Sequence, residues 1–174
     1  MEELKDLKRR LEEERPTGWE QLPDIALYMD QVISYLPRQQ IRFDNAENMT
    51  SAMVNNYIKD GLLPRAEDKR YNRTHLAYLT AISDLKQVLS VKDMAALISA
   101  GTLGPEIETV YLAFQEELDT ALRNTANRIP EEAVEEDLPR LALALALRSY
   151  ADRLACQRII DLIRPSAPDK KKKK

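Results

Sequence analysis

The chain has 174 residues, of which 44% are hydrophobic and only four are glycine, which favours a mainly helical, all-α protein with either one compact domain or a small domain plus a helical extension. Its 26 basic and 29 acidic residues give a net charge of -3, and five of the lysines form the terminal run 170–174, so the overall field excludes nucleic-acid binding unless a local basic patch exists. No apolar run approaches the about 20 residues of a membrane helix and no signal-peptide pattern is present, so we expect a soluble, cytoplasmic protein.

Two helices are predicted before the most informative part of the chain. Residues 1–18 form a highly charged arm, and leucines at helical spacing within it predict a short coiled or docking helix over residues 2–14. A second helix is predicted over residues 24–36, because Pro23 and Asp24 suit a helix start and Pro37 ends it. Trp19 is interpreted as an anchor for the entry into this second helix.

The third predicted helix has one apolar and one polar face. Thr50 is a suitable N-cap, and Gly61 follows the last periodic residue, where a helix commonly ends. The apolar stripe contains Met53, Val54, Tyr57 and Ile58. The opposite face carries short amides, a hydroxyl and a cation, which can pair with base edges and phosphates: Ser51, Asn55, Asn56 and Lys59.

A basic loop follows this helix. Leu62-Leu63-Pro64 leads out in an extended conformation, and the loop closes at Tyr71. Its cations are Arg65, Lys69, Arg70 and Arg73, which could straddle a phosphate backbone if the loop forms a short wing hairpin. Asn72 is then expected to cap a long helix over residues 73–89.

The chemistry of known enzyme sites is not visible in this sequence. His75 is the only histidine, and we interpret it as a surface or partly packed residue rather than a metal ligand or a general base. There is no glycine-rich phosphate loop and no glycine-flanked nucleophilic serine. The sequence therefore predicts a protein that is not an enzyme and has no metal or cofactor.

Two helices are predicted next. Ser90 and Asp93 make a capping box for a short helix over residues 90–100, ended by Gly101. Gly104-Pro105 opens a helix of about 24 residues. Its apolar residues follow the 4-3-4-3 spacing of a coiled-coil-like seam: Ile107, Tyr111, Phe114, Leu118 and Ala121.

The last segment alternates leucine and alanine over residues 141–147, which by period alone would suggest a strand. Alanine and leucine are strong helix formers, so we predict one helix that ends before Pro165. Its leucines spread around the helix and need cover on more than one side, from the same chain or from a second subunit. Cys156, the only cysteine, is interpreted as a small buried hydrophobe, and it excludes an internal disulfide.

The order of helix, GLLP, basic loop, RY, capping residue and helix resembles the winged helix-turn-helix of MerR-type transcriptional regulators. A narrower resemblance is to the bacterial domain-of-unknown-function family number eighteen thirty-six, carried by WEQLPDIALYMDQVI, MVNNYIKDGLLP and KRYNRTHL at residues 19–33, 53–64 and 69–76. The resemblance implies a winged helix-turn-helix domain over residues 19–100. Residues 101–165 are then a helical dimerisation region, and residues 166–174 a disordered lysine-rich tail.

Two functional hypotheses remain open. The first is a homodimeric transcriptional regulator that binds double-stranded DNA through Ser51, Asn55, Asn56 and Lys59 and through the wing cations Arg65, Lys69, Arg70 and Arg73. The second is a protein-interaction module that keeps the helix-turn-helix shape without DNA binding. The acidic balance favours the second hypothesis, whereas the polar helix face and the clustered cations favour the first, which we prefer.

Overall fold

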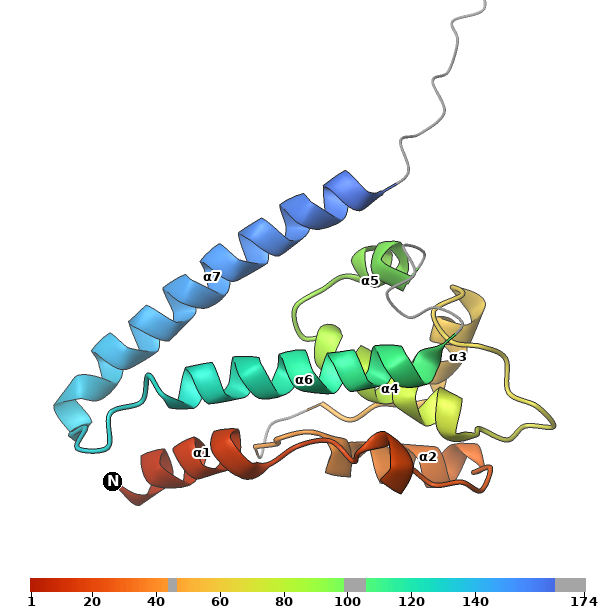
Figure 1. Ribbon diagram of the computed structural model, residues 1–174, viewed down its shortest axis with the longest axis horizontal. Coiled ribbons are helices and arrows are strands. Elements are labelled where there is room, and N and C mark those ends of the chain that lie inside the picture. Colours follow the sequence, from red (N-terminus) through yellow and green to blue (C-terminus); the bar gives the residue numbers. More distant parts are fainter. Residues whose placement is uncertain (44–46, 99–105, 165–174) are drawn as a thin grey trace, which may run out of the picture.

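The computed structural model describes residues 1–43, 47–98 and 106–164, and these residues form α-helices and short 3-10 turns without a strand (Figure 1). In chain order the elements are α1 (Glu2–Glu13), η1 (Trp19–Gln21), α2 (Met29–Tyr35), η2 (Leu36–Gln39), α3 (Ser51–Lys59), α4 (Arg73–Leu85), α5 (Val91–Leu97), α6 (Ile107–Ala126), η4 (Glu135–Asp137) and α7 (Leu138–Ile163). The expectation of a mainly helical protein is confirmed.

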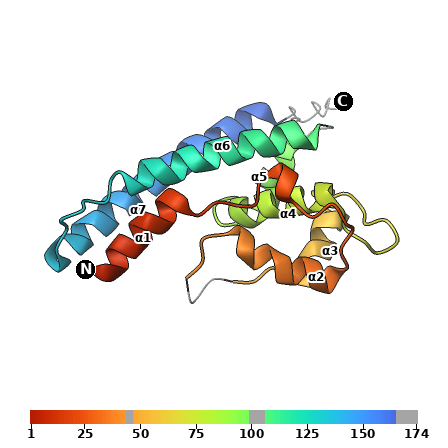
Figure 2. The same ribbon diagram turned by 60° about the horizontal axis from the view of Figure 1, so that its bottom comes forward.

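Helix α6 is the central helix against which α1 and α4 pack. Helix α1 packs along the half of α6 that ends at Ala126, and α4 packs on the other half (Figures 1 and 2). Ion pairs join α1 and its C-terminal extension to α6 and the loop after it: Arg15 Nε lies 2.6 Å from Asp119 Oδ1, and Lys8 Nζ lies 3.2 Å from Glu131 Oε1. The predicted docking helix at the N-terminus therefore forms, and it docks on its own chain.

The hydrophobic core lies between α2, α3, α4 and α6. Val32, Val54, Leu76, Leu79 and Ile82 contribute side chains with no exposed surface. Fully burying side chains of this size stabilises the folded state by about 1.5–3 kcal/mol each before entropy is counted. This core fixes α3 from behind and leaves its other face to solvent.

Two predicted helix boundaries are wrong, the first because of backbone pairing with a distant segment and the second because of a local turn. Helix α2 begins at Met29 rather than Asp24, because Leu27 is extended and pairs with Tyr71 through two backbone hydrogen bonds of 2.8 Å. Helix α4 ends at Leu85 rather than Leu89, and a turn carries the chain on to α5. The predicted N-caps at Thr50, Asn72 and Ser90 each accept a backbone hydrogen bond from the first helical turn.

The predicted wing hairpin is not supported. Within the described residues this segment contains no strand and only two isolated bridges, Leu27 with Tyr71 and Glu67 with Arg70. The ladder does not continue past Glu67 and Arg70, because the Asn72 amide donates to His75 Nδ1 and the Asn72 carbonyl accepts from the Leu76 amide of α4. What remains is a single tight turn.

The apolar seam of α6 is used within the chain. Tyr111 is buried, its ring centroid lies 6.2 Å from that of Trp19, and its hydroxyl donates to the Thr17 carbonyl at 2.9 Å. Phe114 and Leu118 are half-buried and Ala121 is exposed. The predicted start of this helix at Gly104-Pro105, and the end of the preceding helix at Gly101, lie outside the described residues.

Helix α7 is long and sparsely covered. The predicted helix is confirmed and ends at Ile163, but Ile160 is its one buried residue, and Cys156 is half-buried rather than buried. It contacts η4 at its start and α5 near its end, and it diverges from α6 between them (Figure 1). Residues 166–174, expected to be a disordered tail, lie outside the described residues. No helix in the described parts of the chain is long and apolar enough to span a membrane.

Candidate nucleic-acid interface

Helix α3 exposes the polar face that the sequence predicts. Thr50 Oγ1 accepts a hydrogen bond of 3.2 Å from the Met53 amide, and this satisfies one of the free amides at the helix start. Val54 and Tyr57 point into the core. The four residues expected to contact DNA on the opposite face, Ser51, Asn55, Asn56 and Lys59, are all exposed.

The end of α3 is defined by a left-handed residue and two shared hydrogen bonds. Gly61 has φ +74°, a conformation that is strained for other residues. The amides of Leu62 and Leu63 both donate to the Tyr57 carbonyl, at 2.8 and 3.2 Å, and both leucine side chains are buried. This anchorage fixes the direction in which the basic loop leaves the helix.

The basic loop is closed by a two-residue turn. Glu67 and Arg70 exchange backbone hydrogen bonds of 3.2 and 2.8 Å, while Asp68 and Lys69 both have positive φ, at 48° and 62°. Turns of this backbone type suit a tight reversal of the chain. Arg65, Lys69 and Arg70 are exposed, and the loop projects beyond α3 at one end of the molecule (Figures 1 and 2).

Arg70 is held by a tyrosine that the sequence did not single out as functional. Its Nη2 donates to the Tyr28 hydroxyl at 3.0 Å, and its guanidinium lies 5.0 Å from the centre of the same ring. Tyr28 is the N-cap residue of α2 and is about half exposed, at 49%. The Leu27–Tyr71 bridge brings these two side chains together, so Arg70 is oriented before it meets any ligand.

Arg73 differs from the other three loop cations. It is half-buried at the start of α4, and its guanidinium lies 5.7 Å from the centre of the Trp19 ring. Trp19 thus packs against both Arg73 and Tyr111, which agrees with an anchoring role. The structure therefore places Arg65, Lys69 and Arg70 on the exposed loop and sets Arg73 behind them.

The expectation for His75 is wrong, because this residue is buried with 3% of its surface exposed. Its Nδ1 accepts from the Asn72 amide at 3.2 Å, and its Nε2 lies 3.2 Å from the Arg65 carbonyl, to which it can donate. The ring also meets Tyr71 edge-on, with centroids 5.4 Å apart. His75 consequently ties the start of the basic loop to the start of α4, a contact over ten residues that local periodicity could not predict.

The charge of this surface is mixed. Asp60, Glu67 and Asp68 are exposed among the cations of α3 and the turn. Arg65, Lys69, Arg70 and Lys59 outnumber them by one, so the patch is only weakly positive and would bind phosphates modestly. Among the described residues there is no group of three or more histidine, cysteine or acidic side chains arranged to hold a metal ion.

One comparison with known proteins gives a match, and it covers the part of the chain that forms this surface. The family model described as "Domain of unknown function (DUF1836)" matches residues 17–114, which is more than half of the chain and runs from η1 into α6. Comparison with curated proteins and with solved structures gives no significant match. With its match extending over the exposed helix, the basic turn and the core behind them, the chain belongs to the DUF1836 family.

Proposed function

We propose that the protein is a DNA-binding transcriptional regulator that uses α3 and the basic turn in the manner of a MerR-like winged helix-turn-helix. The observation that carries this proposal is the pairing of an exposed amide-rich face on a well-anchored helix with exposed cations that project directly beyond it. Asn55 and Asn56 offer the bidentate amides that suit adenine edges in a major groove. Lys69 and Arg70 offer charges for the adjacent phosphates.

The anchoring of both parts supports this role. Recognition requires side chains on a rigid element, and α3 is capped, backed by the core and fixed at its exit. Arg70 is preoriented by Tyr28, which reduces the entropy lost when the guanidinium meets a phosphate. The turn replaces the longer hairpin of a typical wing and presents its cations on a shorter arm.

We further propose that the protein acts as a homodimer through α7. Leu143, Leu147, Tyr150 and Leu154 are 60%, 59%, 65% and 56% exposed and lie at 4-3-4 spacing. In an antiparallel pair Leu143 would face Leu154 of a second copy, and Leu147 would face Tyr150, so the stripe is self-complementary, as a two-fold interface requires. A helix of 26 residues is about 39 Å long, enough to approach the roughly 800 Å² per partner of a stable interface.

The alternative is a protein-interaction module, and one observation favours it. Asp60, Glu67 and Asp68 interrupt the cations, so the field over the turn would attract DNA less than a continuous basic strip would. In that case the same exposed face of α3 would contact a protein partner. The two functions differ in whether duplex DNA is bound at low salt.

Selection from a random duplex library, at low and at moderate salt, tests the proposal. We expect an enriched sequence with the native chain, and we expect Asn56→Ala to relax the preference at one base position at a cost of about 1–3 kcal/mol. The matched control is Asn124→Ala, which removes an exposed amide from the far half of α6 and should leave the enriched sequence unchanged. No enrichment and no shift of bulk duplex at low salt would overturn DNA binding and leave the protein partner.

A further inference from the structure

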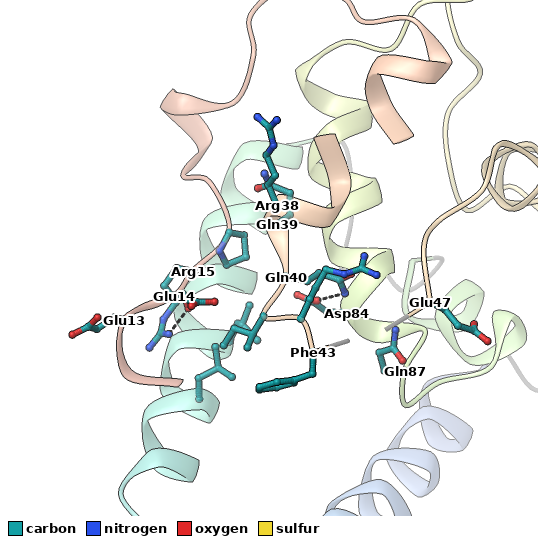
Figure 3. Close-up of a pocket in the computed structure, with 15 residues that line it drawn as sticks. Glu13, Glu14, Arg15, Arg38, Gln39, Gln40, Phe43, Glu47, Asp84 and Gln87 are labelled. Carbon is teal, nitrogen blue, oxygen red and sulfur yellow. Dashed lines mark hydrogen bonds between the residues drawn. The ribbon is translucent and has the colours of Figure 1, made fainter. Parts of the chain in front are cut away.

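A cavity distinct from the α3 surface lies between the C-terminal end of α1, the segment after η2, α4 and α6 (Figure 3). Its volume is about 1160 Å³ and it opens to solvent, which is large enough for a drug-sized molecule. Leu118 and Leu122 of α6, with Ile41 and Phe43, supply an apolar wall. The Phe43 side chain is 56% exposed although it lies in this wall.

Three of the charged residues that line the cavity, Glu13, Glu14 and Arg15, are held in ion pairs. Glu13 pairs with Arg9 and Glu14 with Arg10, at 3.3 and 2.8 Å. Arg15 pairs with Asp119 and also donates to backbone carbonyls of the α1 end, including that of Glu14. These groups have little left to offer a ligand.

The lining also contains Arg38, Arg42, Glu47 and Asp84, and of the two carboxylates among these Glu47 is exposed and Asp84 is half-buried. Asp84 Oδ1 accepts a hydrogen bond of 2.8 Å from the Gln40 amide, and no ion pair to Asp84 occurs in the described parts of the chain (Figure 3). Burial raises the pKa of the Asp84 carboxyl, and the Gln40 hydrogen bond opposes that rise. Arg38 is exposed, and in Figure 3 its side chain extends away from Asp84.

A carboxylate that is half-buried beside an apolar wall and held by an amide alone is best complemented by a cation. We propose that this cavity binds a small organic cation, with its ammonium group at Asp84 and its apolar body against Leu118, Leu122 and Phe43. The inference rests on the cavity alone and is independent of the proposed DNA binding.

Three probes of the same shape and different charge test this inference: phenylbutylammonium, phenylbutanol and phenylbutanoate, each titrated into the full-length chain by NMR. We expect the ammonium to bind at least about tenfold more tightly than the alcohol and the carboxylate, because only it pairs with Asp84. Asp84→Asn keeps an oxygen that accepts from Gln40 but removes the charge. In this variant the ammonium and the alcohol should bind equally.

The matched control is Glu13→Gln, which neutralises a carboxylate at the exposed rim and should change ammonium binding by less than about twofold. Equal thermal unfolding of Asp84→Asn and the native chain would show that the fold is intact. If Asp84→Asn unfolds, Leu122→Lys, which places a cation at the apolar wall, should abolish ammonium binding instead. Equal affinity of the three probes, or no binding of any probe at about 1 mM, would overturn the inference.

Discussion

The family-matched segment and α7 are both rich in apolar residues, but these residues have opposite environments. Residues 17–114 contain nearly all of the buried hydrophobic side chains, whereas α7 buries one residue of 26 and leaves Leu143, Leu147 and Tyr150 more than half exposed. Apolar surface of this extent on one helix is a feature of interaction sites. The contrast teaches that the α3 surface is supported by a buried core, while α7 carries the exposed apolar surface that the proposed dimer would cover.

The largest expected effect separates a core leucine from an α7 leucine. Leu79→Ala should lower the free energy of unfolding by about 2–5 kcal/mol at any protein concentration, because Leu79 is fully buried. Leu147→Ala should lower it only at concentrations where a dimer forms, because its side chain is 59% exposed in the single chain. Urea denaturation at two protein concentrations measures both. If both variants lost the same free energy of unfolding at both protein concentrations, the contrast between the core and α7 would be contradicted.

The next effect concerns association itself. Leu147→Lys places a charge in the middle of the proposed dimer stripe and should weaken association by about 2 kcal/mol or more, as loss of a central contact does. Light scattering over a range of concentrations should then report a monomer where the native chain reports a dimer. Ala142→Lys, exposed and away from the stripe, is the control. A native chain that stays monomeric at high concentration would contradict the proposed dimer through α7.

A smaller, pH-dependent effect is expected where the two regions meet. Arg164 pairs with Asp93 of α5, and hydrogen bonds from Ser90, followed by the charge of Arg164, hold the pKa of Asp93 below its ordinary value. A lowered carboxyl pKa contributes stability that is complete above the ordinary value of about 3.9 and is lost as the pH falls through the folded-state value. Asp93→Asn should therefore destabilise the chain at neutral pH.

The comparison of the native chain and Asp93→Asn by urea denaturation at neutral pH and at a pH below the folded-state pKa of Asp93 measures this contribution. The difference between them should vanish at the lower pH. Asp161→Asn removes the exposed second partner of Arg164 and should have less effect at either pH. A difference that persists in acid would mean that Asp93 acts through shape rather than charge.

The sequence correctly predicted the features that depend only on residues close together in the chain. The caps at Thr50, Asn72 and Ser90 and the left-handed Gly61 follow from short-range hydrogen bonding and backbone sterics. The exposure of Asn55 and Asn56 follows from the apolar stripe opposite them. The candidate α3 face could therefore be recognised from sequence.

The features that the sequence did not predict in this chain include three that depend on contacts between distant segments. The Leu27–Tyr71 bridge shortens α2 and brings Tyr28 to Arg70, a contact across 42 positions. The burial of His75 depends on the Arg65 carbonyl, and the cavity at Asp84 depends on Gln40, 44 positions away. None of these pairings has a period or a spacing that a single sequence reveals.

Salt-dependent binding of a fluorescently labelled duplex tests the central claim most directly. Anisotropy titrations between about 50 and 200 mM salt give the slope of log affinity against log salt, which counts the phosphate contacts. We predict binding by the native chain and a slope smaller by about one unit for Arg70→Ala. Arg128→Ala, an exposed arginine just beyond the far end of α6, should leave the slope unchanged. Equal slopes for Arg70→Ala and the native chain, or no binding at the lowest salt, would contradict a DNA-binding α3 and turn.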